Sequence, residues 1–456
     1  MSKSVILIQP NYRVKKDASY WAANPPLGLC YLASVLEKNH ISVEILDCHV
    51  RNLSASQTAR IIRQKKPDFV GFSILTPAAD WCYAVVKKIK KLPLTIIAGG
   101  PHVSGLPQEA VKKGFDYVVV GEGEQVLLDI VQGKKMTGKI IMAKPLNPNR
   151  LPLPARHLLV KGGTDKPYFS SGTLYYPWAP IITSRGCPYN CYFCNKKTFG
   201  YQFRPRTPEN VLKEIDSLVA NYQVREIDFY DDCFNYDIER AGKIMDLIAG
   251  RRYDLHLRFS NGLRADKITP RLLRKMKKAG TEYIAYGIES GDEKVLAQIP
   301  KVETLKQIEK SIRMTKKAGI TMVGFFIFGL IGDTLTSMQK TIDFMVKLPF
   351  DQVILNIATP FPGTKMWQMI KENKGKLFIK NWQDFFNTSG KMLYHLPGMA
   401  TPSEVEMMYR RANRAFYFRP KYIIKQMPKL LSFKTMPVMY RGLRRILYAL
   451  KNEKNN

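Results

Sequence analysis

The chain has 456 residues, of which 45% are hydrophobic and 24% are charged, which excludes a wholly disordered protein and allows several domains. Its 71 Lys and Arg residues outnumber its 38 Asp and Glu residues, and the resulting formal net charge of +33 predicts attraction to polyanions. No apolar run reaches the roughly 18 residues of a membrane-spanning helix, and the N-terminal apolar stretch is too short for a secretory signal, so we expect a cytoplasmic location.

Residues 1–135 alternate short apolar runs with helical patterns, which predicts a parallel sheet wrapped by helices on both faces. The five predicted strands cover residues 5–8, 43–46, 69–73, 94–98 and 117–120. Five strands at this spacing suit an α/β domain of the flavodoxin-like, doubly wound type, whose ligands bind beyond the carboxyl ends of the strands.

Small residues gather at these strand ends, where they let a bulky ligand approach the backbone. Three ends carry glycine, which favours a ligand site over tight turns alone. The pair Gly121 and Gly123 is not a dinucleotide fingerprint, because a third glycine is missing and the pair follows the last strand rather than the first.

Residues 136–178 are rich in Pro, Gly and Lys, and we expect them to form a connector. Residues 179–385 alternate strand and helix again, with strands predicted at 181–183, 226–230, 255–259, 283–286, 322–328 and 353–357. Six strands are too few for a closed eight-unit barrel, so we expect a partial (βα)₆ barrel of the TIM type with its active site at the carboxyl edge.

Residues 386–456 lose this alternation and predict a basic helical C-terminal segment. From Arg410 onward thirteen Lys or Arg residues face one acid, Glu453. Apolar residues recur at helical spacing, which favours an anionic bilayer surface over nucleic acid, for which no binding module is recognisable. We expect Tyr422, Phe433 and Tyr440 at that interface; the apolar stripe is Met439, Leu443, Ile446, Leu447 and Leu450.

Three of the seven cysteines, Cys187, Cys191 and Cys194, have the spacing C-x₃-C-x₂-C. Three thiolates in one loop can hold three irons of a cubane cluster and leave the fourth iron open, whereas a fourth thiolate would favour plain electron transfer. A zinc site with a distant fourth ligand is the alternative, although no second cysteine pair follows. We interpret Cys233 as a buried, small apolar residue rather than a ligand.

With Phe193 before its third cysteine, this loop resembles the signature of radical S-adenosylmethionine (SAM) enzymes. Residues 1–385 together resemble the cobalamin-binding branch of that family. The resemblance implies a [4Fe-4S] cluster on the three cysteines and reductive cleavage of SAM to a 5′-deoxyadenosyl radical, which abstracts hydrogen from an unactivated carbon.

The resemblance also implies cofactor-binding residues at the strand ends. For SAM, it assigns the methionine amino group to Asp231 and Asp232, the ribose and carboxylate to Glu289 and Ser290, and the adenine site to the neighbourhood of Gly324 and Gly329. Phe193, in the cysteine loop, is also expected to be a cofactor-binding residue. For cobalamin, the resemblance assigns Ser73, Leu75, Gly99, Gly100, Gly121 and Glu122.

The segment Asp47-Cys48-His49 partly matches the D-x-H-x-x-G motif that supplies an imidazole to cobalt. Position 52 is Asn, however, and Asp47 follows the second strand, whereas the motif belongs after the first. We therefore expect His49 to be a loop histidine, and the resemblance implies cobalamin with its dimethylbenzimidazole detached and no histidine on cobalt.

The resemblance favours methylation of an unactivated carbon of a hydrophobic or lipid-like substrate. Radical oxidative cyclisation or rearrangement, as in protoporphyrin ester cyclases, is an alternative, and a cobalamin or Fe–S sensor without turnover is an alternative of another class. The expected partners are a small-molecule or lipid substrate, a reducing donor of the flavodoxin or ferredoxin type, and an anionic membrane surface that would hold the protein peripherally.

Overall fold

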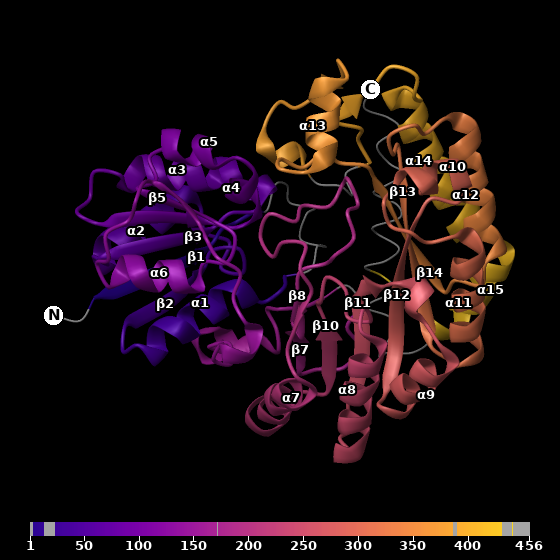
Figure 1. Ribbon diagram of the computed structural model, residues 1–456, viewed down its shortest axis with the longest axis horizontal. Coiled ribbons are helices and arrows are strands. Elements are labelled where there is room, and N and C mark those ends of the chain that lie inside the picture. Colours follow the sequence, from indigo (N-terminus) through magenta and orange to yellow (C-terminus); the bar gives the residue numbers. More distant parts are fainter. Residues whose placement is uncertain (1–2, 13–22, 171, 386–389, 431–439, 441–456) are drawn as a thin grey trace.

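The computed structural model describes residues 3–12, 23–170, 172–385, 390–430 and 440. Two α/β units lie side by side, the N-terminal one on the left of Figure 1 and the barrel on the right. Each is built on a six-stranded parallel sheet. The predicted fold class is therefore confirmed.

The N-terminal sheet has the strand order β2-β1-β3-β4-β5-β6, whose first five strands follow the flavodoxin-like order 2-1-3-4-5. Its strands are β1 (Ser4–Gln9), β2 (Ser42–Asp47), β3 (Phe69–Ser73), β4 (Thr95–Gly99), β5 (Tyr117–Val120) and β6 (Ile140–Met142). Its helices are α1 (Leu27–Lys38), α2 (Ala55–Lys65), α3 (Ala79–Ile89), α4 (Pro101–Gly105), α5 (Pro107–Lys112) and α6 (Glu124–Val131).

Both faces of this sheet are buried, which explains why its strands read as continuous apolar runs. Along β1, Val5 and Leu7 pack in one core with residues of α1 and α6. Ile6 and Ile8 point to the opposite face and pack in a second core with residues of α2 and α3. Alternate side chains of one strand thus supply two cores.

The sheet extends beyond residue 135, because β6 pairs parallel with β5 inside the range expected to be a connector. Three residues are too few to show a strand period, so the sequence pattern missed this strand. The rest of that range holds short 3₁₀ turns, including Pro148–Arg150 and Arg156–Leu158.

The barrel sheet has the order β14-β13-β12-β11-β10-β7, so the expected partial six-stranded barrel is confirmed. Its first strand lies three residues earlier than expected and ends at Ile181. The strands are β7 (Trp178–Ile181), β10 (Glu226–Phe229), β11 (His256–Leu263), β12 (Thr281–Glu289), β13 (Thr321–Phe328) and β14 (Gln352–Ile357).

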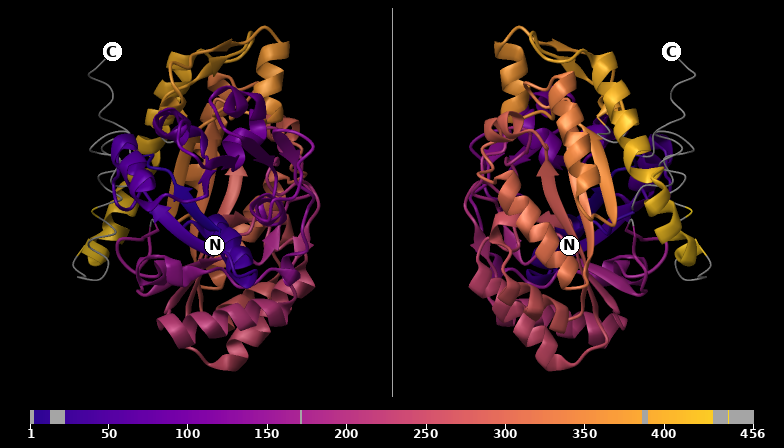
Figure 2. Two further views of the ribbon diagram at one scale, coloured as in Figure 1. Left: turned by 90° about the vertical axis from the view of Figure 1, so that its left-hand side faces the viewer. Right: turned by 90° about the vertical axis from the view of Figure 1, so that its right-hand side faces the viewer.

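Most of the helices on the outside of this barrel begin at a capping residue, such as Thr207, Asp237 and Thr304, whose side chain accepts a hydrogen bond from the first turn. The helices are α7 (Pro208–Tyr222), α8 (Ile238–Arg251), α9 (Pro270–Lys278), α10 (Glu293–Gln298), α11 (Leu305–Lys317), α12 (Leu335–Lys347) and α13 (Lys365–Glu372). Figure 2 shows the N-terminal domain in front of the barrel when the molecule is viewed from that side.

The C-terminal residues are partly built into the barrel. Strand β15 (Lys376–Leu377) pairs with β16 (Tyr394–His395) across the expected boundary at residue 385. Helix α14 (Pro402–Tyr417) buries Val405 and Phe416 in the barrel core and is followed by α15 (Pro420–Leu430). Phe433 and the predicted stripe from Met439 to Leu450 lie outside the described residues.

Within the described part of the chain, no helix combines the length and apolarity needed to cross a bilayer.

Candidate active site

The cysteine loop, residues 186–203, follows β7 at the carboxyl edge of the barrel. Its neck is a two-stranded ladder in which β8 (Ser184–Arg185) pairs with β9 (Arg204–Pro205). Gly186 has φ +81°, and a Cβ there would lie 2.2 Å from the carbonyl oxygen of Gln202. A side chain does not fit at this position, so the glycine permits the turn into the first cysteine.

Tyr192 fixes the middle of the cysteine loop to the barrel. Its side chain is buried, and its hydroxyl accepts a hydrogen bond of 3.2 Å from the backbone N–H of Ile331. Its carbonyl oxygen accepts another of 2.8 Å from Met366 N–H. Phe193 packs edge to face on the Tyr192 ring, with centroids 5.5 Å apart. The Phe193 ring is therefore held against Tyr192, next to Cys194.

The structure brings a fourth thiol to the cysteine loop. Cys191 and Cys194 are hydrogen-bonded to each other, and Cys187 is hydrogen-bonded to Cys233 from the end of β10. Cys233 is buried, as expected, but it contacts a member of the trio. Sequence spacing could not reveal this contact, because forty-six residues separate the two cysteines.

The surroundings of the loop favour the thiolate form of Cys187 and Cys191, whereas the contact with Cys191 and burial raise the pKa of Cys194. The hydrogen bond from Cys233, with the nearby Lys196 ammonium, lowers the pKa of Cys187 to about 5. The hydrogen bond from Cys194, with the Lys301 ammonium, also lowers the pKa of Cys191. Since thiolates are the form that binds iron, the donor set fits an Fe–S cluster. In the described residues no three His, Cys, Asp or Glu side chains converge as ligands for a metal ion.

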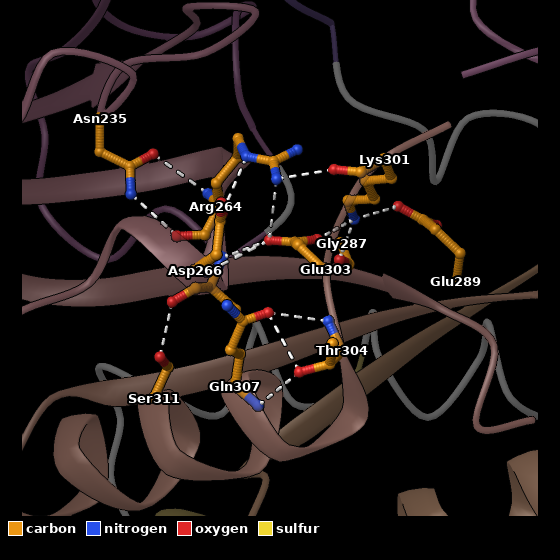
Figure 3. Close-up of polar contacts among 11 residues, drawn as sticks. Asn235, Arg264, Asp266, Gly287, Glu289, Lys301, Glu303, Thr304, Gln307 and Ser311 are labelled. Carbon is orange, nitrogen blue, oxygen red and sulfur yellow. Dashed lines mark hydrogen bonds and ion pairs between the residues drawn. The ribbon is translucent and has the colours of Figure 1, made fainter. Parts of the chain in front are cut away.

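A buried charge network lies beside this loop, at the carboxyl ends of β11 and β12 (Figure 3). Lys301 Nζ lies 3.1 Å from Glu289 Oε1 and 3.1 Å from Glu303 Oε2. Arg264 lies 2.9 Å from Asp266 and stacks its guanidinium 3.4 Å from the ring centroid of Tyr189, in the cysteine loop. Burial alone would lower the pKa of Lys301, but the two glutamates raise it above its ordinary value. The lysine is therefore held as a cation.

Glu289, at the end of β12, has the unusual backbone angle φ +68° for a residue other than glycine. Its side chain folds back over Gly287, where a Cβ would lie 2.5 Å from Glu289 Oε1 and 2.9 Å from Lys301 Nζ. Strained backbone of this kind persists where the surroundings over-determine it, often at functional sites. The structure thus places Glu289 at the predicted edge, already paired with a lysine.

The two aspartates after β10 have different surroundings. Asp231 is buried and accepts hydrogen bonds from Thr183 N–H (3.1 Å), Thr183 Oγ1 (2.7 Å) and Ser184 Oγ (2.5 Å). Its carboxylate therefore holds the chain that leads into β8. Asp232 is exposed and accepts a hydrogen bond of 3.3 Å from Gly186 N–H, beside Cys187. Of the two aspartates, Asp232 is therefore the one that contacts the cysteine loop.

Ser290, directly after β12, and Gly324, within β13, both have packed surroundings. The Ser290 hydroxyl is buried, 3.3 Å from Thr341 Oγ1, and accepts a hydrogen bond of 3.2 Å from Asp292 N–H in the turn before α10. Gly324 lies in the middle of β13, where a Cβ would lie 2.8 Å from the Phe326 ring. The position of Gly324 is explained by packing within the barrel wall and not by the carboxyl edge at which the adenine was expected.

The residues expected to bind cobalamin include a group at the carboxyl ends of β3 and β4. Ser73 pairs with Gly99 in the last register position of the two strands, and Leu75 is 38% exposed beside them. A Cβ on Gly99 would meet only one atom within 4 Å, at 3.9 Å, so the space above this glycine is open. Gly100 instead packs on Ile74, 2.7 Å from its backbone nitrogen. The residues present fit a ligand at this edge.

Glu122 has another partner. Its carboxylate is buried between the domains, where Arg185 Nη1 lies 2.6 Å from Oε2 and Arg204 pairs with Oε1. Arg185 Nη2 also lies 2.7 Å from Glu124 Oε1. We name these four side chains the interdomain clamp. It joins the neck of the cysteine loop to the end of β5, beside Gly121. The side chain of Glu122, which was assigned to cobalamin, therefore forms ion pairs between the domains.

Asn195, directly after the third cysteine, makes a second link between the domains. Its Nδ2 donates hydrogen bonds to the carbonyl oxygens of Pro101 in α4 (3.1 Å) and Pro362 after β14 (3.2 Å). Nearby, a Cβ on Gly105 would lie 2.4 Å from the Pro362 oxygen. The cysteine loop is therefore fixed to both domains.

His49 follows β2 and is buried, in the short turn where the sequence placed a loop histidine. Its ring stacks on Tyr12, with centroids 3.7 Å apart and planes 8° apart. Asp47 accepts a hydrogen bond of 2.9 Å from Tyr168 OH in the linking segment. His49 thus packs within the N-terminal domain, and Asp47 attaches the linking segment through Tyr168.

Comparison with known proteins matches two family models to this chain. The model described as the B12 binding domain matches residues 19–131. The model of the radical SAM superfamily matches residues 181–345, which include the cysteine loop and the ends of β10 and β12.

The chain is 32% identical to an uncharacterized methyltransferase of Pyrococcus horikoshii, over 97% of this chain and 98% of that protein. It is 27% identical to an anaerobic magnesium-protoporphyrin IX monomethyl ester cyclase of Rubrivivax gelatinosus, over 80% of this chain and 69% of the relative. The solved radical SAM methyltransferase TsrM of Kitasatospora setae, with cobalamin and a [4Fe-4S] cluster bound, has the same fold, with a TM-score of 0.71, 18% identity, and coverage of 92% and 90% of the two chains.

Proposed function

The chain belongs to the cobalamin-binding branch of the radical SAM enzymes, and from this premise we propose that it methylates an unactivated carbon of a hydrophobic or lipid-like substrate. The cofactors are a [4Fe-4S] cluster, SAM and cobalamin; reductive cleavage of SAM supplies the 5′-deoxyadenosyl radical, and cobalamin supplies the methyl group. The single observation that carries the proposal is the junction of the cysteine loop with the carboxyl edge of the N-terminal sheet, through the interdomain clamp.

Within this proposal the residues have distinct tasks. Cys187, Cys191 and Cys194 would hold the cluster as thiolates, a form that hydrogen bonds from Cys233 and Cys194, with the nearby cations, favour at Cys187 and Cys191. Glu289, oriented by Lys301, would accept hydrogen bonds from ribose hydroxyls. Ser73, Leu75, Gly99 and Gly100 would line the cobalamin tail.

The inner face of the barrel supports an apolar substrate. Side chains at alternate positions of β13, such as Phe326 and Phe328, pack in the core with the helices. Phe325 and Ile327 belong to the opposite face and are half-buried, as is Ile354 on β14. Half-buried aromatic and aliphatic groups around a site favour an apolar ligand.

Oxidative cyclisation is the second candidate function, favoured by the similarity to the Rubrivivax gelatinosus cyclase. Both reactions begin with hydrogen abstraction, so they differ in the product. Methylation adds one methyl group from cobalamin to the substrate, whereas cyclisation removes hydrogen and leaves the carbon count unchanged. A cofactor-binding sensor would produce no 5′-deoxyadenosine at all.

The proposed partners are the substrate and a reducing protein of the flavodoxin or ferredoxin type. An anionic membrane surface is also proposed, since the net charge of the chain is +33. The enzyme would then be cytoplasmic and peripheral to the membrane.

The test is anaerobic reconstitution with iron, sulfide and cobalamin, followed by assay of SAM cleavage under strong reduction and mass analysis of products from candidate lipids. The expected result is 5′-deoxyadenosine together with a product heavier by one methyl group. In the Cys191→Ala variant two ligands remain, so cluster and cleavage should both be lost. Cys30→Ala, which removes a buried cysteine of α1, is the matched control and should keep both. Full cleavage by Cys191→Ala would overturn the proposed cluster site.

A further inference from the structure

Helix α15 reverses the usual arrangement of a surface helix, which buries its apolar side chains. The positions that face the barrel are largely polar. Gln426 is buried, and Lys425 reaches back so that its Nζ lies 2.5 Å from Asp351 Oδ1. Tyr422, expected at a membrane interface, instead packs against the barrel side, with its ring 5.3 Å from that of Tyr417. The helix is therefore attached mainly through polar and tyrosine contacts.

The aliphatic side chains of α15 point outward. Ile424 is 66% exposed, Met427 is 56% exposed and Ile423 is 48% exposed, and Phe418, just before the helix, is 52% exposed. We call these four residues the apolar face of α15. Three of these large apolar side chains lie on α15 and the fourth lies just before it, and exposed apolar side chains gathered in this way favour an interaction site.

We propose that the apolar face of α15 binds an anionic membrane surface, with its side chains inserted at the headgroup boundary. Interfacial helices combine a set of apolar anchors with Lys or Arg, and here Lys421 belongs to the same helix as the anchors, while Lys425 is paired with Asp351. This inference rests on the membrane partner in the proposed function and deepens it by locating the contact at α15, and it requires neither cofactor nor substrate.

Charge complementarity decides between the possible occupants of this face. Helix α15 contains Lys421, Lys425 and Lys429 and no acid, and residues 431–456 add six more Lys or Arg residues against Glu453 alone. Docking of that tail, or of a second copy of the chain, would bring like charges together at the contact. Anionic lipid headgroups would attract the same charges.

The position of α15 suits a membrane anchor, because the helix lies far from the proposed active site. Lys425 pairs with Asp351, directly before β14, and Tyr417 OH contacts the backbone of Val353 in the same strand. These contacts lie at the amino end of β14, opposite the edge that carries the cysteine loop. Figure 1 shows α15 on the outer flank of the barrel, on the side away from the N-terminal domain. Membrane binding there would leave the proposed active site uncovered.

The experiment is sedimentation of the full chain with vesicles of phosphatidylglycerol and phosphatidylcholine in equal parts, and with vesicles of phosphatidylcholine alone. The test variant is Ile424→Glu/Met427→Glu. The control is Met142→Glu, which places the same charge on a side chain that is 71% exposed on β6. Melting temperature and SAM cleavage are measured for each protein, so that misfolding and loss of the proposed chemistry are seen separately from loss of binding.

The expected result is binding to the anionic vesicles only, weakened by high salt and weakened about tenfold or more in the double variant, since two apolar anchors are replaced by charges. Met142→Glu should bind like the unmodified chain. Equal binding of the double variant would overturn the proposal, because the face would then not contact the lipid. Absence of binding to either vesicle, or a dimer that the double variant dissociates, would also overturn it.

Discussion

Lys301 links the end of β12 to the surroundings of the cysteine loop. Its ammonium touches the carboxylates of Glu289 and Glu303, and it lowers the pKa of Cys191 together with the hydrogen bond from Cys194. One buried cation therefore serves both a proposed SAM-binding carboxylate and a proposed iron ligand.

Lys301→Met is expected to destabilise the protein by about 3 kcal/mol, because it leaves Glu289 without the cation that it pairs with and Glu303 with Arg264 alone. SAM affinity of the cluster-loaded protein should fall as well, since Glu289 loses its support. Thermal unfolding and equilibrium binding measure the two effects. Lys340→Met breaks the pair of a more exposed lysine with Asp292 and should cost under about 1 kcal/mol. Recovery of SAM affinity in Lys301→Arg would support the positioning role, and unchanged affinity in Lys301→Met would contradict it.

His102, at the start of α4, makes stability depend on pH. Its buried ring lies between Thr76 Oγ1 (3.3 Å) and Tyr83 OH (3.1 Å), and burial lowers its pKa to about 4. An unfolded histidine titrates near pH 6.5, so between these values the unfolded chain binds more protons. The stability that comes from the neutral ring is thus present above about pH 6.5 and is lost as the pH falls, by about 3 kcal/mol in full.

The measurement is the unfolding midpoint in denaturant at about pH 7 and about pH 5, for the unmodified chain and for His102→Gln. The variant should lose part of the decrease in stability on acidification, because its side chain does not titrate. His157→Gln, at an exposed position, should behave like the unmodified chain. The same decrease in His102→Gln would show that other groups cause the pH dependence.

At the scale of elements, the β8–β9 ladder and Gly186 set the entry of the cysteine loop. The three cysteines are close in sequence, but their arrangement depends on this neck and on Tyr192. Tyr192 is held by backbone hydrogen bonds from Ile331, after β13, and Met366, in α13. Local sequence thus supplies the ligands, and pairing of distant segments supplies their geometry.

Gly186→Ala is expected to abolish most cluster loading, because the new methyl group would clash with the carbonyl oxygen of Gln202. Gly200→Ala is a matched control in the same loop, with φ +75° but no atom within 4 Å of the added Cβ. It should cost only about 1 kcal/mol of backbone strain and retain the cluster. Iron content and visible absorbance after anaerobic reconstitution measure the difference. Equal loading of both variants would contradict the role assigned to the neck.

At the scale of the whole molecule, the interdomain clamp joins the two sheets at their carboxyl edges. Arg185 and Arg204 balance Glu122 and Glu124 in charge, and the Arg185 guanidinium also lies 5.1 Å from the ring centroids of Tyr31 and Phe199. Because Arg185, Glu122 and Glu124 are all buried, removal of the arginine leaves an uncompensated charge between the domains.

Arg185→Met is therefore expected to lower stability by about 3 kcal/mol or more and to separate one cooperative thermal transition into two, one for each domain. Differential scanning calorimetry measures both effects. Arg225→Met breaks an exposed pair with Asp254 and should change the transition little. A single, unshifted transition in Arg185→Met would show that the domains are held together by other contacts.

The sequence by itself determined the two sheets, their parallel strands and the cysteine spacing. These features depend on residues that are close together in the chain, namely the strand and helix periods and the local metal-ligand pattern. The sequence missed the short strand β6, and it did not reveal that Ser290, after β12, and Gly324, on β13, have packed surroundings. Only the tertiary structure brought Lys301 to Glu289, Cys233 to Cys187 and Arg185 to Glu122. Contacts between groups far apart in the chain depend on how strands and domains pack, and no sequence period or spacing records that packing.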